Sequence, residues 1–292
     1  MKIGIDLGGS HIAVGVITKE GKLLAKQDQN EMIINQENIT QWIRDRILSL
    51  IHCVLKELQI PIFVIEEIGI GVPGIVKENK IENIRKYGIG KWDLAKELEE
   101  HYQIPVRIQN DAICSAKAEK QYGALKDVER AVFLCLGTGI GGVTLINNSI
   151  LPSEYGHMVI DKEGRTCHCG KKGCFETYSS MQAFKKGMIE QMNLNPNTTS
   201  EELLVILKKE KQNEELNHYI DNYIQTLLIG ISNIVNIINP EKICIGGSFT
   251  YFEDILYKRL LEKALTTPYQ FEKPEIVLAK LQNTAGIIGA TL

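Results

Sequence analysis

The chain has 292 residues, which is enough for one large domain or two of ordinary size. Its content of 44% hydrophobic and 24% charged residues is typical of globular proteins and argues against a disordered or collagen-like chain. The net charge of −3 shows no excess of basic residues, so we expect no nucleic-acid partner. No apolar run approaches the roughly 18 residues of a membrane span, and the N-terminus runs directly into a strand pattern. We therefore expect a cytoplasmic protein without a membrane partner.

The first half of the chain is predicted to be a series of strands that end in turns, interrupted by helices. Short β-prone runs bounded by glycine or proline indicate strands, and apolar residues at helical spacing indicate helices. In chain order we expect strands at 2–7, 12–18 and 22–26, a helix at 38–59, a strand at 68–72, a helix at 93–102, a strand at 105–109, and a helix that begins at Asn110-Asp111.

The second half repeats this order of elements. We expect strands at 131–136 and 143–146, a helix-rich region at 181–238, strands at 242–245 and 276–281, and a final helix at 283–292. Aligning Leu7-Gly8 with Leu136-Gly137 places Val14 on Val143. This pattern predicts an internal duplication, although chance similarity between short apolar strands is the alternative.

Two lobes follow from the duplication. We expect an N-terminal lobe over residues 1–117, completed by the helix at 283–292. A C-terminal lobe would cover residues 118–282 and carry a metal-binding loop at 157–174.

Glycine-rich turns follow the first strand of each half. A tight turn after a strand exposes backbone N–H groups that can hold phosphate oxygens, and glycine lets a phosphate approach closely. A lone Gly-Gly is more often plain hairpin chemistry, but two turns at corresponding places predict a bound nucleotide. The candidate nucleotide-binding residues are Gly8, Gly9, Ser10, Gly137, Thr138 and Gly139, with Gly246 and Gly247 near the nucleoside.

One histidine and three cysteines form a candidate metal site: His157, Cys167, Cys169 and Cys174. This ligand set matches tetrahedral Zn²⁺ with no open position, which is typical of structural zinc. His168 could replace His157 as the fourth ligand, and three unrelated buried thiols are the remaining alternative. The other four cysteines lie in apolar segments and are expected to pack in the core.

Four acidic residues are candidates for chemistry. Asp111 follows a strand and begins a helix, where a carboxylate can either act on a substrate or cap the helix. Asp6 lies at a strand end beside the first glycine turn, where it could hold Mg²⁺ directly or through water. Glu154 and Glu176 flank the cysteine cluster, and each alone is more often a solvated surface residue.

Together these motifs resemble the ROK family (repressors, open reading frames, kinases). The segments that carry the resemblance span nearly the whole chain: Asp6-Leu7-Gly8-Gly9-Ser10, Gly71-Val72-Pro73-Gly74, Asn110-Asp111-Ala112, Glu154-Tyr155-Gly156-His157, and Cys167-x-Cys169-Gly170-x-x-Gly173-Cys174-x-Glu176. The resemblance implies an α/β, duplicated actin-like (ribonuclease H-like) ATPase fold with two lobes around a cleft.

The resemblance also implies an activity, the transfer of the terminal phosphoryl group of ATP to a hydroxyl, expected to be the 6-hydroxyl, of a hexose or hexose derivative. Asp111 would be the general base. The implied sugar contacts are Gly74, Asn110, Asp111, Glu154, His157 and Glu176. Mg²⁺ would arrive with ATP, Zn²⁺ would be structural, and the chain would form a homodimer.

Residues 84–88 depart from the family pattern. They read Ile-Arg-Lys-Tyr-Gly, which resembles the β-glucoside kinase branch, whereas zinc cysteines are commoner among glucokinases and N-acetylmannosamine kinases. Two other interpretations compete with the kinase. One is a sugar-sensing regulator, which would carry a helix-turn-helix domain ahead of the first turn; we expect no room for it before Asp6. The other is a zinc-dependent interaction module that has lost its activity, which would also have lost its phosphate turns.

Overall fold

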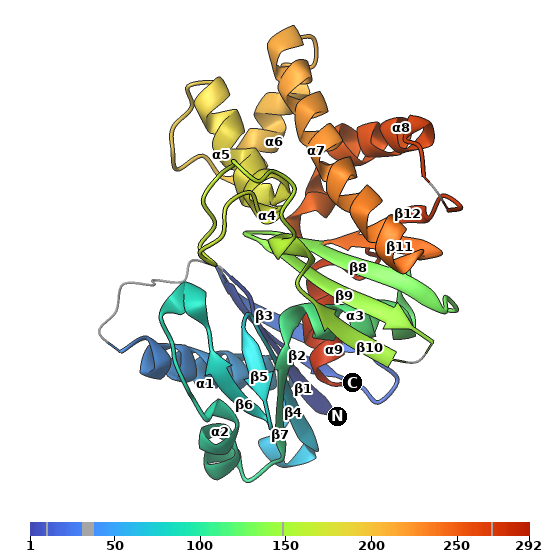
Figure 1. Cartoon of the computed structure of the whole chain (residues 1–292). Coiled ribbons are helices and arrows are strands. Elements are labelled where there is room, and N and C mark those ends of the chain that lie inside the picture. The colour runs from blue at the N-terminus through green and yellow to red at the C-terminus, as the bar shows by residue number, and fades with distance from the viewer. Residues whose placement is uncertain (10, 31–37, 148, 270) are drawn as a thin grey trace. The chain divides into compact units, whose positions relative to one another are not determined.

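A computed structural model describes residues 1–9, 11–30, 38–147, 149–269 and 271–292. Contacts within the chain divide it into two compact units. Unit 1 comprises Met1–Lys126 and Lys280–Leu292, and unit 2 comprises Asp127–Ala279. Both ends of the chain therefore belong to unit 1 (Figure 1).

A five-stranded mixed sheet forms the centre of unit 1, with the strand order β3-β2-β1-β4-β7. Strand β1 pairs antiparallel with β2 and parallel with β4, and β4 pairs parallel with β7. The strands are β1 (Lys2–Leu7), β2 (His11–Ile17), β3 (Leu23–Asn30), β4 (Glu67–Val72) and β7 (Val106–Asn110), and a two-stranded ribbon adds β5 (Ile75–Lys77) and β6 (Lys80–Asn83).

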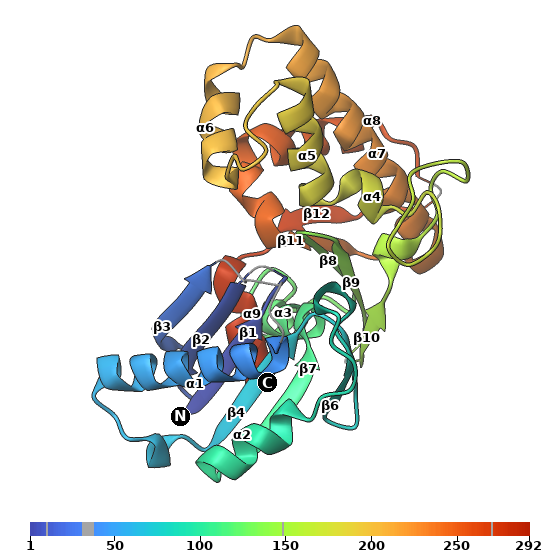
Figure 2. The ribbon, with the colours of Figure 1, turned by 90° about the vertical axis from the view of Figure 1, so that its left-hand side faces the viewer.

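Helices cover both faces of this sheet. Helices α1 (Ile39–Leu58) and α2 (Leu94–Tyr102) pack over one face, which Figure 2 shows in front, where Ile3, Ile5 and Leu7 join their core. On the opposite face, α3 (Asp111–Tyr122) and α9 (Ala285–Ala290) contribute to a second, smaller cluster. Because side chains alternate along a strand, Gly4 and Asp6 lie on this second face.

Small residues let the C-terminal helix α9 approach the sheet closely. A Cβ atom on Gly4 would lie 2.0 Å from the carbonyl oxygen of Ile287, and one on Gly69 would lie 1.8 Å from that of Ala290. Any larger side chain at these positions would push the helix away, so the glycines are needed for packing. Helix α9 is therefore an integral layer of unit 1.

Unit 2 repeats the sheet of unit 1 and adds more helices. Its strand order is β10-β9-β8-β11-β12, with β8 and β9 antiparallel and β8, β11 and β12 parallel. The strands are β8 (Arg130–Leu136), β9 (Ile140–Ile146), β10 (Ser149–Ser153), β11 (Lys242–Gly246) and β12 (Glu275–Leu278). The helices are α4 (Glu176–Ser179), α5 (Met181–Gln191), α6 (Ser200–Lys209), α7 (Glu214–Ile238) and α8 (Lys258–Thr266).

The duplication predicted from the sequence appears in both sheets, but our alignment of the second strands was wrong by one residue. Leu7 pairs with Ile12, which leaves four residues in the first turn, whereas Leu136 pairs with Ile140 and leaves three in the second. Val14 is therefore equivalent to Gly142 and not to Val143. The shorter turn in unit 2 explains the error, because a gap of one residue was not visible in the apolar pattern.

The predicted elements are found with shifted ends. The ribbon β5–β6, the strand β10 and the helices α4 and α8 were not predicted. The expected lobe boundary between residues 117 and 118 falls inside α3, while the contact-defined units meet at Lys126 and Asp127. The assignment of these units as functional lobes stays a prediction. None of the helices within the described ranges is long and apolar enough to cross a membrane.

Candidate functional site

In unit 1 the candidate residues gather at the carboxyl ends of the parallel strands. Asp6 pairs with Gly71 of β4, and Val72 pairs with Asn110 of β7. The turns that follow β1, β4 and β7 therefore leave the sheet along the same edge. This edge is where open α/β sheets generally bind their ligands.

Asn110, and not Asp111, caps helix α3. Its side-chain oxygen accepts hydrogen bonds from the backbone N–H groups of Ala112 at 3.0 Å and Ile113 at 3.2 Å. Its amide nitrogen donates to the carbonyl oxygen of Gly74 at 3.2 Å. The Asn110 amide therefore connects the turn after β4 with the start of α3. The cap of α3 is Asn110, so the alternative interpretation of Asp111 as the cap is wrong.

Asp111 is the first residue of α3 and is partly buried. Burial raises the pKa of its carboxyl to about 7, the charge of Asp6 adds to this rise, and hydrogen bonds from the backbone oppose it. One of the opposing bonds runs from the N–H of Ala112 to Oδ1 at 2.8 Å. A carboxyl with a pKa near neutrality can both accept and release a proton at physiological pH.

The glycine turn of unit 1 is closed by a hydrogen bond from the N–H of Gly8 to the carbonyl oxygen of His11 at 2.9 Å. Ser10 lies outside the described residues. The imidazole Nε2 of His11 lies 3.4 Å from Oδ2 of Asp6, and this hydrogen bond raises the pKa of His11 although burial opposes the rise. The Tyr87 hydroxyl donates to the carbonyl oxygen of Gly8.

His11 and Tyr87 are contacts of this site that the sequence analysis missed. His11 stands directly after the glycines, so its position in the turn was a usable signal. Tyr87 lies in the segment that departs from the family pattern, but nothing in the sequence indicates that its hydroxyl reaches a residue 79 positions away.

The glycine turn of unit 2 is closed by a bond from the N–H of Gly137 to the carbonyl oxygen of Gly139 at 3.0 Å. The N–H of Gln182 donates to the carbonyl oxygen of Gly137 at 3.2 Å. Thr138 is exposed. A Cβ on Gly139 would lie 2.7 Å from Oε2 of Glu176, which brings the predicted phosphate turn and a predicted sugar contact together within unit 2.

Gly246 is the last residue of β11, and Gly247 follows it beside this turn. A Cβ on Gly246 would lie 2.8 Å from the ring of Phe133, and one on Gly247 would lie 2.5 Å from the carbonyl oxygen of Leu136. Gly247 also has a φ of +75°, a conformation that glycine adopts without strain. Packing against β8 therefore accounts for both glycines, and their contact with a nucleoside stays a prediction.

The segment from Glu154 to His157 forms a short 3₁₀ turn after β10. Tyr155 is buried, and its hydroxyl shares a hydrogen bond of 2.6 Å with Thr144 of β9. This bond fixes the turn to the sheet. The Glu154 side chain is 83% exposed, with its carboxylate 3.9 Å from Nε2 of His157.

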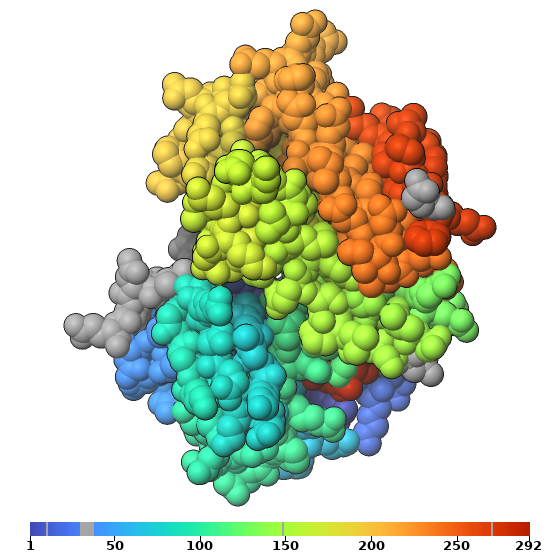
Figure 3. Space-filling view, in the orientation of Figure 1, coloured from blue at the N-terminus to red at the C-terminus, as the bar shows by residue number. Residues whose placement is uncertain are grey.

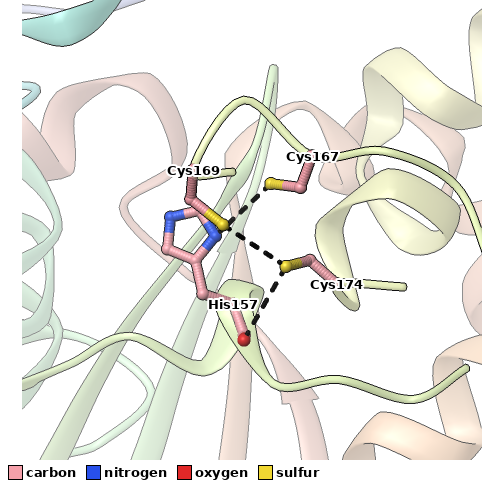
Figure 4. A group of neighbouring side chains, drawn as sticks. All are labelled: His157, Cys167, Cys169 and Cys174. Carbon is pink, nitrogen blue, oxygen red and sulfur yellow. Dashed lines mark hydrogen bonds between the residues drawn. The ribbon is translucent and has the colours of Figure 1, made fainter. Parts of the chain in front are cut away.

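The four predicted metal ligands converge in unit 2, as Figure 4 shows. Their ligand atoms all lie within 4.8 Å of one another. Sγ of Cys169 lies 3.6 Å from Sγ of Cys174, and Sγ of Cys167 lies 3.7 Å from Nδ1 of His157. Zinc–sulfur bonds of about 2.3 Å in a tetrahedron place two sulfur atoms about 3.8 Å apart, so the donor set and spacing fit Zn²⁺.

His168 belongs to a different group. Its Nδ1 lies 3.2 Å from Oε1 of Glu176 and 3.8 Å from Sγ of Cys167, and its side chain is 64% exposed. Among the described residues, the group of one histidine and three cysteines contains His157. The geometry therefore favours His157 as the fourth ligand.

The loop that carries the cysteines is held around its sulfur atoms. The N–H of Cys167 donates to the carbonyl oxygen of Lys171 at 2.8 Å, and the N–H of Gly170 donates to that of Cys167 at 3.0 Å. Gly170 and Gly173 have positive φ angles, which let the short loop reverse. Most of residues 161–172 are exposed on the face that Figure 3 shows, while Cys167 and Cys174 are buried.

A family model described as "ROK family" matches residues 2–292, the whole chain apart from its first residue. The chain belongs to the ROK family. The resemblance stated from the motifs is thereby confirmed, and so is the α/β actin-like ATPase fold that ROK kinases share.

The curated relatives include both glucokinases and xylose repressors. A glucokinase of Thermotoga maritima is 29% identical over 315 residues, covering 99% of this chain and 95% of the relative. A xylose repressor of Bacillus subtilis is 30% identical over 254 residues, covering 84% of this chain but only 64% of the repressor. The ROK family membership therefore does not by itself choose between a kinase and a regulator.

Among solved structures, that of a ROK family glucokinase from Streptomyces griseus, in complex with glucose and AMPPNP, has a TM-score of 0.83. Its sequence is 21% identical, and the match covers 99% of this chain and 97% of the glucokinase. At this identity the match shows the ROK fold alone. The activity of this chain has to be argued from its own residues.

Proposed function

We propose that this ROK protein is an ATP-dependent sugar kinase that phosphorylates a hydroxyl, expected to be the 6-hydroxyl, of a hexose or hexose derivative such as glucose, a β-glucoside or N-acetylmannosamine. The observation that carries this proposal is Asp111. It combines a pKa raised to about 7 with a position beside the glycine turn, at the strand edge that favours ligand binding.

In this proposal Asp111 is the general base. Its carboxylate accepts the proton of the attacking hydroxyl while the oxygen bonds to the γ-phosphorus and ADP leaves. Phosphoryl transfer depends mainly on positioning and charge stabilisation, and a base typically adds about 10²- to 10⁴-fold in rate. Asn110 and Gly74, which are joined by a hydrogen bond, would hold the sugar beside the base.

Each unit would also supply its glycine turn to the nucleotide. Gly8 and Gly9 in unit 1, and Gly137, Thr138 and Gly139 in unit 2, would offer backbone N–H groups to phosphate oxygens. The Mg²⁺ that accompanies ATP supplies positive charge to the phosphates, and Asp6 is the residue placed to hold it. Gly246 and Gly247 would lie near the nucleoside.

The proposed contribution of unit 2 to sugar binding consists of Glu154, His157 and Glu176. With zinc bound to one imidazole nitrogen, the tautomer of His157 is fixed and its other nitrogen can face a sugar hydroxyl. Zn²⁺ here supplies structural order to the loop. Its four protein ligands leave no position open for substrate.

The proposal is tested by ADP release with Mg-ATP and a panel of glucose, N-acetylglucosamine, N-acetylmannosamine, fructose and cellobiose. Asp111→Asn is the matched control, because its amide keeps the shape of the carboxyl and cannot act as the base. We expect one sugar to give turnover, and the variant to lose about 10²- to 10⁴-fold in kcat while it still binds nucleotide. Turnover that survives at the wild-type rate in Asp111→Asn would refute this role.

A second candidate function is that of a sugar-sensing regulator without kinase activity. The observation that favours it is the similarity to xylose repressors at an identity close to that of the glucokinase. Calorimetry separates the two functions. A regulator would bind a sugar without turning over ATP, whereas the kinase would do both.

The identity of the sugar is a separate question, and residues 84–88 bear on it. The structure places Tyr87, in the middle of this segment, against the glycine turn of unit 1. Strong preference for cellobiose in the panel would support the β-glucoside branch. We also propose that the chain forms a homodimer through its helix-rich region, and light scattering that shows a monomer at micromolar concentration would refute this.

A further inference from the structure

A hairpin-like segment in unit 1, residues 81–92, holds Tyr87 at its tip. Ile81 and Trp92 exchange backbone hydrogen bonds of 3.1 and 2.9 Å, and Ile84 and Ile89 exchange bonds of 2.9 and 3.2 Å. These four side chains are buried in the core of unit 1. Two pairs of bonds and a buried apolar base make this segment, hereafter the 81–92 hairpin, a firm support for its tip.

Tyr87 points inward from this tip, and its side chain is buried. Its hydroxyl donates to the carbonyl oxygen of Gly8. Burial raises the pKa of Tyr87, and the charges of Asp111 and Asp6 raise it further, so that the phenol stays protonated. A protonated hydroxyl is a donor at every physiological pH, so a change of pH within this range does not remove the donor.

The carbonyl group of Gly8 and the N–H group of Gly9 belong to one planar peptide unit and point in opposite directions. Glycine residues flank this unit on both sides, so little steric hindrance stops it from rotating by half a turn. A rotated unit would present a carbonyl oxygen where a phosphate needs an N–H group. The bond from Tyr87 selects one of the two orientations.

The 81–92 hairpin also borders the residues proposed to hold the sugar. Asn83 immediately precedes Ile84 in the hairpin. A Cβ on Gly74 would lie 2.2 Å from the carbonyl oxygen of Asn83. Gly74 in turn accepts the hydrogen bond from Asn110. One short segment of chain thus touches both the sugar side and the phosphate side of unit 1.

We propose that Tyr87 is a positioning residue that fixes the Gly8–Gly9 peptide unit, so that the N–H of Gly9 is aimed for binding the phosphates of ATP. This inference rests on the proposed kinase function. It assigns to residues 84–88 a role in nucleotide binding, in addition to any effect on the choice of sugar. Tyr87 does not touch the reacting atoms in this role.

The test is Tyr87→Phe, which removes one hydroxyl and keeps the ring. We expect the KM for Mg-ATP and the Kd for Mg-AMPPNP to rise about tenfold, the change expected when one buried hydrogen bond is lost. The KM for the sugar should stay within about twofold. Tyr102→Phe is the matched control, because Tyr102 is a partly buried tyrosine of unit 1. Its hydroxyl makes no hydrogen bond to another described residue, so the substitution removes none.

Two results would overturn the inference. One is a Kd for Mg-AMPPNP that is unchanged in Tyr87→Phe, and the other is an equal rise in Tyr102→Phe. Because the Kd is measured without turnover, a wild-type chain that binds nucleotide but phosphorylates no sugar would refute the kinase and leave this test readable.

Hydrogen exchange on the wild-type chain gives a second measurement that does not depend on the folding of a variant. Mg-AMPPNP should slow amide exchange in residues 84–88 together with the Gly8–Gly9 turn. Slower exchange at the turn alone would show that the hairpin tip does not support it, and would contradict the proposal.

Discussion

The two glycine turns occupy equivalent places in the two sheets, yet they carry different chemistry. In unit 1 Asp6 precedes the turn by one residue and His11 ends it, whereas in unit 2 the equivalent residues are Cys135 and Gly139. The two copies therefore share the backbone arrangement of the turn, while the hydrogen-bonded pair of His11 and Asp6 belongs to unit 1. Unit 2 carries the cysteine cluster instead.

The turns also differ in how their first carbonyl group is held. The oxygen of Gly8 accepts from a side chain, Tyr87, and the oxygen of Gly137 accepts from the backbone N–H of Gln182 in helix α5. A side-chain donor can be removed by many single substitutions, whereas a backbone N–H is removed only by proline. The carbonyl group of Gly8 is therefore held by a contact that ordinary side-chain substitutions can change.

The largest expected effect lies in unit 2, at the metal ligands. We expect Cys174→Ser to lose zinc, because a hydroxyl is a poor replacement for a thiolate, and to destabilise the chain by about 3 kcal/mol or more, or roughly 10 °C in Tm. Metal analysis and calorimetry measure both changes. Cys53→Ser in α1 of unit 1 is the control, and zinc loss in that variant or full zinc retention in Cys174→Ser would contradict the site.

The next largest effect is the dependence of kcat on pH, which we expect to follow the ionisation of Asp111 in unit 1. Because Asp111 must be ionised to accept a proton and its pKa is raised to about 7, kcat should fall about tenfold for each pH unit below 7 and level off above it. A profile of kcat against pH measures this. A plateau that extends to pH 5 would show that the raised pKa does not govern turnover.

The same raised pKa predicts a change in stability of opposite sense. A carboxyl whose pKa is higher in the folded state than in the unfolded state loses stability as pH rises from about 4 to about 7. Asp111→Asn should therefore raise Tm at pH 8 and have little effect at pH 4. Thermal unfolding at the two pH values decides the sign.

A pair of glycine substitutions compares the turns directly. A Cβ on Gly137 would have nothing within 4 Å, whereas one on Gly8 would lie 2.2 Å from the imidazole of His11. We expect Gly137→Ala to keep the wild-type Tm and raise the KM for ATP by about tenfold if phosphate approaches this turn. Gly8→Ala should raise the KM and also lower Tm. A wild-type KM in Gly137→Ala would exclude a close approach of phosphate to Gly137.

The smallest effect concerns the sugar side of unit 2. Tyr155→Phe removes the hydrogen bond to Thr144 that fixes the turn carrying Glu154 and His157. We expect the KM for the sugar to rise about three- to tenfold with the KM for ATP unchanged, which is the reverse of the result expected for Tyr87→Phe. Steady-state kinetics with each substrate varied in turn distinguishes the two tyrosines. Equal changes in both KM values would show that Tyr155 has only a general structural role.

The sequence by itself determined the features that depend on neighbouring residues. Short apolar runs bounded by glycine or proline located most of the strands, and apolar residues at helical spacing located α1 (Ile39–Leu58). The cysteine cluster could also be predicted, because three of its four candidate metal ligands lie within eight residues and the ligand types are typical of structural zinc sites.

Only the tertiary structure decided the features that join distant parts of the chain. The contact of Tyr87 with Gly8, the cap formed by Asn110, and the close approach of α9 to Gly4 all depend on which faces meet after folding. The difference of one residue between the turns followed from the pairing of β1 with β2 and of β8 with β9. Local periodicity specifies which side chains prefer burial, but strand register and packing choose their partners, and these are set by the whole fold.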